Sequence, residues 1–298
     1  MAQPSISVLM PAYKAEATIM RAAKSVLDQD WPNIELVIAS DDGEDYIAVL
    51  ANHGLSDDRI RQVHTGGTGT GDWNARNSAL AAANGDLVTL IDSDDEYAPG
   101  RLSALAPIAN ANGAAIDNTQ LFLNDVVVTT LLHEDEKRES ETVEATAPLI
   151  LRDRTPVFPM WRRRDFSIGW HKLPHASDVI FSLELLSAAP QMRVISHGGY
   201  RYYKRPGSMT LSDTMTERSR TAYYSIIASI TAGNYALTPK IADFALYEIA
   251  KNLNQAKSFG QLLAKDPNLT HEMLAIRFNQ RAMIESERIA FFEGELEL

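Results

Sequence analysis

The sequence predicts an α/β protein whose central sheet is mostly parallel and has helices on both faces, followed by a helical C-terminal region. Over the first 110 residues, short apolar runs alternate with segments of helical spacing, and the loops between them are short. From 215 to 292, nearly every segment has helical character. Ligands bind such sheets at the carboxyl ends of the strands, so we expect the functional residues there.

Composition excludes several classes of protein. Of 298 residues, 45% are hydrophobic and 22% are charged, which is enough apolar material for a sizeable core. The net charge of −11 makes broad nucleic-acid binding a poor fit, because such binding depends on neutralising phosphates. The absence of cysteine excludes disulfides, zinc–thiolate sites and cysteine nucleophiles.

The first half contains four short apolar strands with helices between them. The strands are predicted at 6–10, 35–39, 60–63 and 87–91, and the helices at 16–29, 44–53 and 74–83. Helical spacing of Ile19, Ala22, Ala23, Val26 and Leu27 marks the first helix. Residues 64–72 are rich in glycine and threonine, which predicts a loop. The first strand is expected to end at Met10, because Pro11-Ala12-Tyr13 breaks its pattern.

The second half has a different pattern. Residues 114–132 predict a hairpin with its turn at Asn124 and Asp125. The charged run at 133–147 predicts a solvated loop or a frayed helix. Arg, Trp, Phe and His are dense from 154 to 175, which favours a binding surface over a core. A helix is expected at 178–188 and extended chain at 192–205.

The run Asp92-Ser93-Asp94-Asp95 is the strongest local signal for chemistry. An apolar strand that ends in three carboxylates is costly unless a cation lies nearby. Mg²⁺ and Mn²⁺ prefer oxygen ligands and are often shared with substrate phosphates. The alternative is that these side chains cap the next helix.

Seven other residues have both a structural and a functional interpretation. Asp41 and Asp42 would cap a helix, or would accept hydrogen bonds from a base or ribose. Arg76 would bind an acid or phosphate, or form a surface salt bridge. Asp178 would cap the helix that follows it, or serve as a general base near an acceptor hydroxyl. Trp161, Trp170 and Tyr203 would stack on a sugar or base, or pack partly in the core.

Four segments in order resemble the family-2 glycosyltransferases of the GT-A fold. Residues 6–13 resemble the opening strand and the turn that cradles the nucleotide base, and 35–45 resemble the second strand with its acidic pair. Ala75-Arg76-Asn77 matches the family's Ala-Arg-Asn, and 85–95 matches the strand with its D-x-D metal motif. The set covers roughly the first hundred residues, and its order makes it specific.

The resemblance implies an inverting, single-displacement transfer from a nucleotide-diphosphate sugar, with a UDP-sugar favoured, to a hydroxyl of a saccharide or lipid-linked saccharide. Asp178 would be the catalytic base. Asp94 would hold Mn²⁺ or Mg²⁺, with Asp92 at the ribose or at the metal. The residues implied for the nucleotide-sugar are Pro11, Ala12, Tyr13, Asp41, Asp42, Arg76, Asp92, Ser93 and Arg205.

At two positions the chain departs from the family pattern. Ser177 stands where the family usually has Glu before the base, so a supporting carboxylate is missing. Arg205 falls where His is common, and because Arg cannot ligate a metal it would contact the diphosphate instead.

The resemblance also implies three regions. Residues 1–110 would be the nucleotide-sugar-binding half of a GT-A domain, 111–212 its acceptor-binding half, and 213–298 a helical C-terminal extension. We expect a cytoplasmic location, because no signal peptide or apolar spanning segment is found in the sequence. Peripheral contact with the inner face of the membrane and a homodimer are further alternatives.

Two other functions remain alternatives. A sugar- or nucleotide-binding protein that kept the fold and lost catalysis would fit the changes at Ser177 and Arg205. A sugar nucleotidyltransferase would also use metal-bound carboxylates. Its expected glycine-rich loop after the first strand is absent from residues 11–15, which counts against it.

Overall fold

The computed structural model describes residues 3–123, 126–132, 142–151, 156–204 and 214–265. The chain divides into two compact units. The first comprises residues 1–172 and 177–203, and the second comprises residues 173–176 and 204–298. The predicted boundaries at 110 and 212 stay predictions.

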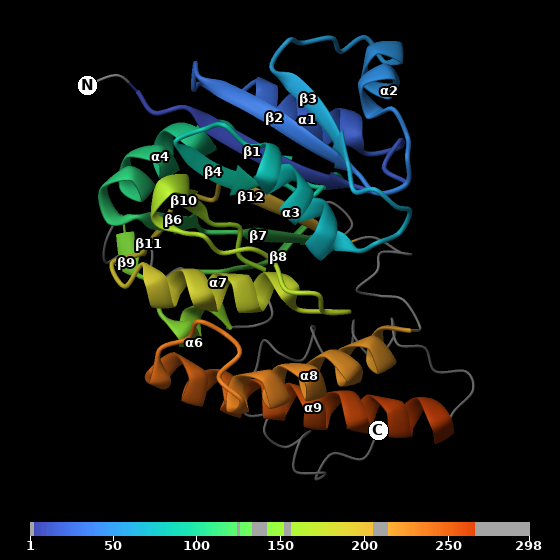
Figure 1. The fold of residues 1–298 in the computed structure, drawn as a ribbon, viewed down its shortest axis with the longest axis vertical. Coiled ribbons are helices and arrows are strands. Elements are labelled where there is room, and N and C mark those ends of the chain that lie inside the picture. The colour runs from blue at the N-terminus through green and yellow to red at the C-terminus, as the bar shows by residue number, and fades with distance from the viewer. Residues whose placement is uncertain (1–2, 124–125, 133–141, 152–155, 205–213, 266–298) are drawn as a thin grey trace. The chain divides into compact units, whose positions relative to one another are not determined.

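The first unit is built on an eight-stranded sheet with the order β3-β2-β1-β4-β10-β6-β11-β9 (Figure 1). Its strands are β1 (Ile6–Ala12), β2 (Ile34–Ser40), β3 (Ile60–His64), β4 (Leu87–Leu90), β6 (Ala114–Asp117), β9 (Thr142–Glu144), β10 (Met160–Arg162) and β11 (Arg193–Ile195). The strands β3, β2, β1 and β4 are mutually parallel, as predicted. Beyond them β10 is antiparallel to both β4 and β6, so the second half of the sheet is mixed.

Helices flank this sheet and supply most of the remaining core. They are α1 (Ile19–Leu27), α2 (Tyr46–Asn52), α3 (Asp72–Ala82), α4 (Arg101–Asn112), α6 (Ala147–Ile150), a 3₁₀ turn (Arg163–Asp165) and α7 (Ser177–Ala188). The five apolar residues predicted for the first helix are all buried in α1. Strand β1 is central, and its residues from Ile6 to Met10 are fully buried on both faces. The fold is therefore the predicted α/β class, with a large central sheet between helices.

The first strand is longer than predicted. It continues through Pro11 to Ala12, where the register pairs it with Ala39 and Ser40 of β2. Proline cannot donate to a ladder, but the Ala12 carbonyl accepts from the amide of Asp41 at 2.9 Å. Pro11 and Ala12 consequently belong to the sheet, and the turn begins at Tyr13.

A second sheet of four strands has the order β5-β12-β7-β8. Its strands are β5 (Glu96–Tyr97), β7 (Gln120–Leu123), β8 (Val126–Thr130) and β12 (Tyr200–Lys204). The predicted hairpin at 114–132 is thus partly wrong, because only β7 and β8 form it while β6 joins the large sheet. This second sheet places β12 directly against β5, which follows the acidic segment at 92–95.

The tryptophans of the segment 154–175 lie in the core, so the predicted binding surface is wrong for them. Trp161 and Trp170 are 1% and 3% exposed. Their rings pack against each other and against Phe181 of α7, with centroids 4.1 to 6.1 Å apart. Burying three large rings stabilises the attachment of α7 to the sheet.

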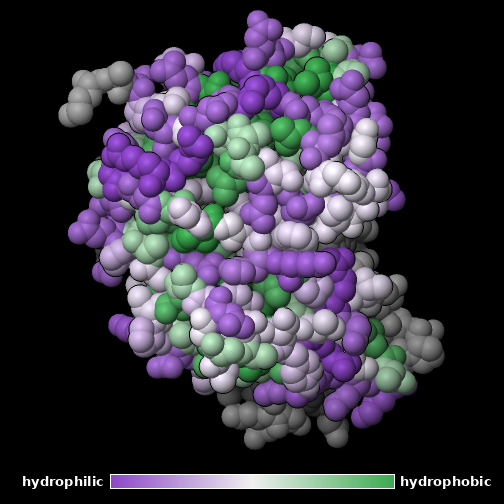
Figure 2. Space-filling view, in the orientation of Figure 1, coloured by the Kyte–Doolittle hydropathy of each residue, from purple (hydrophilic) through white to green (hydrophobic). Residues whose placement is uncertain are grey.

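The second unit contains two helices that pack against each other, α8 (Met215–Thr231) and α9 (Pro239–Lys265). Their buried apolar residues include Ile226 of α8 and Ile249 and Phe259 of α9. Among the described residues, no helix is long and apolar enough to span a bilayer. On the face of the molecule in Figure 2, hydrophobic and hydrophilic residues are interspersed.

Candidate functional site at the carboxyl ends of the strands

The predicted site residues follow neighbouring parallel strands. Register pairs Leu9 of β1 with Leu90 of β4, and Ala12 of β1 with Ser40 of β2. The segments after β1, β2 and β4 therefore leave the sheet at one edge, and Tyr13, Asp41 and Asp92 belong to these segments. Tyr13 is 45% exposed. Its hydroxyl oxygen lies close to Gly69, 3.7 Å from the point where a Cβ would stand if this residue had a side chain.

Asp41 holds the glycine-rich loop. Its carboxylate accepts hydrogen bonds from the Thr65 hydroxyl at 2.7 Å, from the Thr70 amide at 3.0 Å and hydroxyl at 2.5 Å, and from the Gly71 amide at 3.0 Å. Burial alone would raise the pKa of Asp41, but the hydrogen bonds from Thr70, Thr65 and Gly71 lower it. The charged carboxylate thus fixes the loop that approaches Tyr13.

Asp42 holds the turn that follows β1. It accepts from the Lys14 amide at 2.5 Å, from the Tyr46 hydroxyl at 2.7 Å, and from Glu44 and Ser40 at 3.1 Å. Lys14 has a φ of +51°, a left-handed conformation that costs a non-glycine residue energy. The hydrogen bond to Asp42 stabilises that conformation, and it fixes the direction in which the chain leaves β1.

Arg76 is buried between two carboxylates. Its guanidinium donates to Asp72 at 3.0 Å within α3, and to Asp92 at 3.0 Å after β4. The Arg76 side chain is only 7% exposed, so the surface salt bridge considered above is wrong. Burial opposes the charge, but the carboxylates of Asp92, Asp72 and Asp178 outweigh it and keep the pKa of Arg76 above its ordinary value.

Asp178 lies in the first turn of α7, where it interacts electrostatically with Arg76 and Asp72. Burial raises the pKa of its carboxyl, Arg76 lowers it, and the like charge of Asp72 raises it again, with a net upward shift. The Ser177 hydroxyl donates to Asp72 at 3.3 Å. The structure therefore brings Asp92, Arg76 and Asp178 into one electrostatic cluster, as a site requires.

Asp72 was missed by the sequence analysis. It joins Arg76 and the start of α7, although 105 residues separate it from Ser177. The i, i+4 spacing of Asp72 and Arg76 on a predicted helix was a usable signal for their pairing. Nothing local could indicate the contact with Ser177.

The acidic loop, residues 92–95, does not cap a helix. The next helix, α4, begins at Arg101 after Gly100, and no side chain caps it. Asp92, Ser93 and Asp94 are half-buried, whereas Asp95 is fully buried and points inward. Burial, followed by the charges of Asp94 and Asp92, raises the pKa of Asp95 well above its ordinary value.

Arg21 and Tyr203 also hold this loop. Arg21 of α1 donates to the Asp94 carbonyl, and its guanidinium carbon lies 4.2 Å from the Tyr203 ring centroid. Tyr203 donates to Glu96 at 2.9 Å and stacks on Phe122, with ring centroids 4.9 Å apart. These packed contacts occupy the ring that was considered for stacking on a sugar or base.

The donor set of the acidic loop fits a hard divalent cation. No group of three or more His, Cys, Asp or Glu able to hold a metal occurs among the described residues. Mg²⁺ is commonly held by one or two carboxylates together with substrate phosphates, so a fuller protein cage is not required. Asp92 and Asp94 are both half-buried, and the Asp92 carboxylate accepts a hydrogen bond from Arg76 at 3.0 Å. Arg205 lies outside the described residues.

Comparison with known proteins decides the family. The profile of glycosyl transferase family 2 matches residues 7–169, more than half of the chain. The chain belongs to this family. The predicted resemblance is thereby confirmed, and with it the expectation of a glycosyltransferase at the level of the family.

Curated relatives match over part of their length. The succinoglycan biosynthesis protein ExoO of Rhizobium meliloti is 26% identical over 222 residues, 70% of this chain and 63% of ExoO. A UDP-Glc:alpha-D-GlcNAc-diphosphoundecaprenol beta-1,3-glucosyltransferase of Escherichia coli is 37% identical over 125 residues, 41% of this chain and 49% of the relative. A GalNAc(5)-diNAcBac-PP-undecaprenol beta-1,3-glucosyltransferase of Campylobacter jejuni is 32% identical over 114 residues, 38% of this chain and 37% of the relative. The chain thus spans less than two thirds of these relatives.

Solved structures share the fold. S. aureus TarS 1-349 in complex with UDP-GlcNAc aligns with a TM-score of 0.64 and 21% identity, over 95% of this chain and 82% of TarS 1-349. The mannosyltransferase PcManGT of Pyrobaculum calidifontis, in complex with GDP-Man and Mn²⁺, aligns with a TM-score of 0.58 and 16% identity, over 97% and 83%. The predicted GT-A fold is confirmed.

Proposed function

We propose that the protein transfers a sugar, with inversion, from a nucleotide-diphosphate sugar to a hydroxyl of a saccharide or lipid-linked saccharide. The observation that carries this proposal is the buried Arg76, which contacts Asp92 and interacts electrostatically with Asp178. It links the acidic loop to a carboxylate whose pKa is raised, as a general base requires. The names of the relatives support polysaccharide or lipid-linked sugar synthesis.

Asp178 would act as the base of a single displacement. The acceptor oxygen attacks the anomeric carbon, the bond from that carbon to the diphosphate oxygen breaks, and the acceptor proton passes to Asp178. A divalent cation bound at Asp94 and Asp92 would offset charge on the leaving diphosphate. Arg76 holds Asp92 in place, and Asp178 must be ionised to accept the proton.

The donor would bind at the edge formed by the ends of β1, β2 and β4. The exposed ring of Tyr13 would face the base, while Asp41 and Asp42 fix the glycine-rich loop and the turn on either side of it. A UDP-sugar is favoured because a family neighbour of the same fold binds UDP-GlcNAc. Residues 1–110 would contribute this half, and 111–212 the acceptor half.

Calorimetric titration tests this function. UDP, GDP and a set of their sugars would each be titrated with and without Mn²⁺ into the wild type, Asp94→Ala, and Asp58→Ala as a control for loss of an exposed carboxylate. We expect UDP to bind only with Mn²⁺, binding to be lost in Asp94→Ala, and Asp58→Ala to match the wild type. Absence of metal-dependent nucleotide binding in the wild type would contradict the transferase. Binding without transfer would favour the catalytically impaired alternative.

A further inference from the structure

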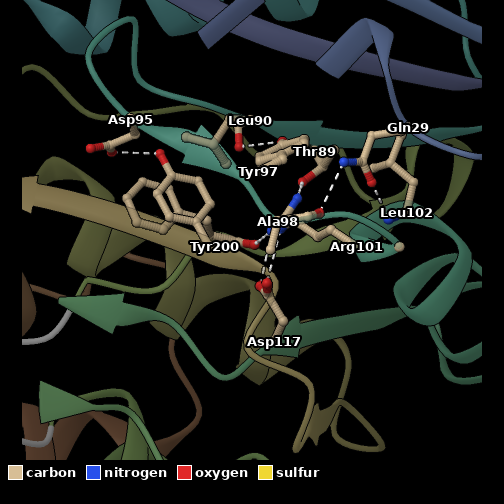
Figure 3. Close-up of polar contacts among 12 residues, drawn as sticks. Gln29, Thr89, Leu90, Asp95, Tyr97, Ala98, Arg101, Leu102, Asp117 and Tyr200 are labelled. Atoms are coloured by element: carbon tan, nitrogen blue, oxygen red, sulfur yellow. Dashed lines mark hydrogen bonds and ion pairs between the residues drawn. The ribbon is translucent and has the colours of Figure 1, made fainter. Parts of the chain in front are cut away.

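The hydroxyl of Tyr200 contacts the acidic loop at two points. It accepts a hydrogen bond from the Asp92 amide at 3.0 Å and donates one to the Asp95 carboxylate at 2.8 Å. Figure 3 shows the hydrogen bond between Tyr200 and Asp95. Both residues are fully buried, so water cannot replace either partner without opening the core. The backbone at the start of the loop is thus fixed by a single side chain.

Strand β12 holds the other end of the loop as well. The second oxygen of Asp95 accepts from the Tyr203 amide at 2.9 Å, and the Asp95 amide donates to the Asp92 carbonyl at 3.0 Å. Tyr200 pairs with Tyr97 of β5, which follows the loop directly. Both ends of the acidic loop are therefore attached to one strand, and Asp92 and Asp94 project from a fixed backbone.

Packing prevents the Tyr200 ring from shifting. Phe158 stacks on it with ring centroids 3.5 Å apart, and the Tyr97 ring meets it edge-on at 5.7 Å. The Arg101 guanidinium carbon lies 5.3 Å from its centroid, and Arg101 forms a paired hydrogen bond with Asp117 at 2.9 and 3.0 Å (Figure 3). Moving the hydroxyl would require repacking this whole cluster.

We propose that Tyr200 is a positioning residue, which sets the direction of the Asp92 and Asp94 carboxylates for a metal-bound nucleotide. The inference rests on the proposed function. A site whose ligands are held by fixed hydrogen bonds loses less freedom when the ligand binds. Asp95 acts with Tyr200, because its inward carboxylate fixes the hydroxyl that accepts from the Asp92 amide.

The test compares two buried tyrosines of one cluster. Tyr200→Phe removes the hydroxyl that contacts the acidic loop, and Tyr97→Phe removes a hydroxyl that donates to the Leu90 carbonyl of β4 at 2.7 Å. Mn²⁺-dependent UDP binding would be measured by calorimetry, and hydrogen exchange of the 92–95 segment by mass spectrometry. We expect binding about tenfold weaker and faster exchange in Tyr200→Phe, with both unchanged within about twofold in Tyr97→Phe.

Thermal unfolding of both variants separates this role from general packing. Similar losses of melting temperature with a selective loss of binding in Tyr200→Phe would support the proposal. Equal losses of binding in the two variants, or none in Tyr200→Phe, would overturn it. If the wild type bound no nucleotide, the proposed function would fail, and the hydrogen-exchange data alone would test the role of Tyr200. Faster exchange of the 92–95 segment only in Tyr200→Phe would support the role of this residue in fixing the loop. Equal exchange in the two variants would reject that role.

Discussion

At the scale of single residues, the proposed transfer depends on the balance of charges around Asp178. Burial and the like charge of Asp72 favour its protonated form, while Arg76 favours the ionised form. Arg76 is itself buried and divided between Asp72 and Asp92. A base with a raised pKa binds a proton more strongly than an ordinary carboxylate does, which helps proton abstraction near neutral pH.

Replacing Asp178, the proposed base, should remove transfer while leaving donor binding intact. In Asp178→Asn we expect kcat to fall by about 10²- to 10⁴-fold, because the general base is lost. Nucleotide affinity measured by calorimetry should stay close to the wild type. Asp45→Asn is the matched control, since Asp45 also starts a helix, accepting from Ala48 at 3.0 Å, and Asn caps a helix equally well. Retained transfer in Asp178→Asn would reject its assigned role.

The raised pKa of Asp178 predicts the direction in which kcat changes with pH. The proposed role of Asp178 needs its ionised form, so the rate should be full above that pKa and fall as the pH drops through it. That fall should lie at a higher pH than it would for an ordinary aspartate. Asp72→Asn removes a like charge, lowers the pKa of Asp178 and should move the acidic limb to lower pH. An unchanged limb in this variant would show that another group titrates.

At the scale of elements, the site depends on contacts that join the two sheets. Strand β12 of the small sheet contacts the loop that leaves β4 of the large sheet through Tyr200. Arg101 of α4 and Asp117 of β6 form a fully buried ion pair beneath it, with further hydrogen bonds from Arg101 to Thr89 and to the Phe158 carbonyl. This pair fixes α4 against the sheet from which the acidic loop begins.

Breaking the ion pair between Arg101 and Asp117 should lower the stability of the folded protein. In Asp117→Asn the buried Arg101 charge loses its partner, and we expect a loss of about 3–5 kcal/mol in the free energy of unfolding. Asp57→Asn is the control, because its ion pair with Arg59 is partly exposed and should contribute about 0–1 kcal/mol. Chemical denaturation at pH 7 measures both, and equal losses would contradict the assigned difference.

At the scale of the whole molecule, the fold of the chain follows glycosyl transferase family 2. The fold likeness extends over 95% of this chain in the TarS comparison, whereas the family profile ends at residue 169. The family profile thus includes the carboxyl ends of β1, β2 and β4, which hold the candidate site, and it ends before Asp178 of α7.

The anomeric configuration of the product tests whether the transfer proceeds with inversion. A single displacement with Asp178 as base inverts the anomeric configuration, so an α-linked nucleotide sugar should give a β-linked product. Proton NMR of the product, through the coupling constant at the anomeric position, measures this directly. An α-linked product would contradict a single displacement and require a second nucleophile.

The sequence by itself indicated the family and the segments that carry the candidate site residues. Short apolar runs marked β1, β2, β3 and β4, and the polar residues after them marked the edge of the sheet. These features are local, because a strand and the turn that ends it are encoded within a few residues. Asp92, Arg76 and Asp178 were all named from such local patterns, although their cluster was not.

Only the tertiary structure decided which side chains meet. Asp95 points inward to Tyr200, Asp72 contacts Ser177, and Trp161 and Trp170 pack in the core. The first two contacts join residues 105 apart in the chain. Neither spacing nor composition encodes such pairs, because they depend on the order of strands in the sheets and on how side chains fill the space between them.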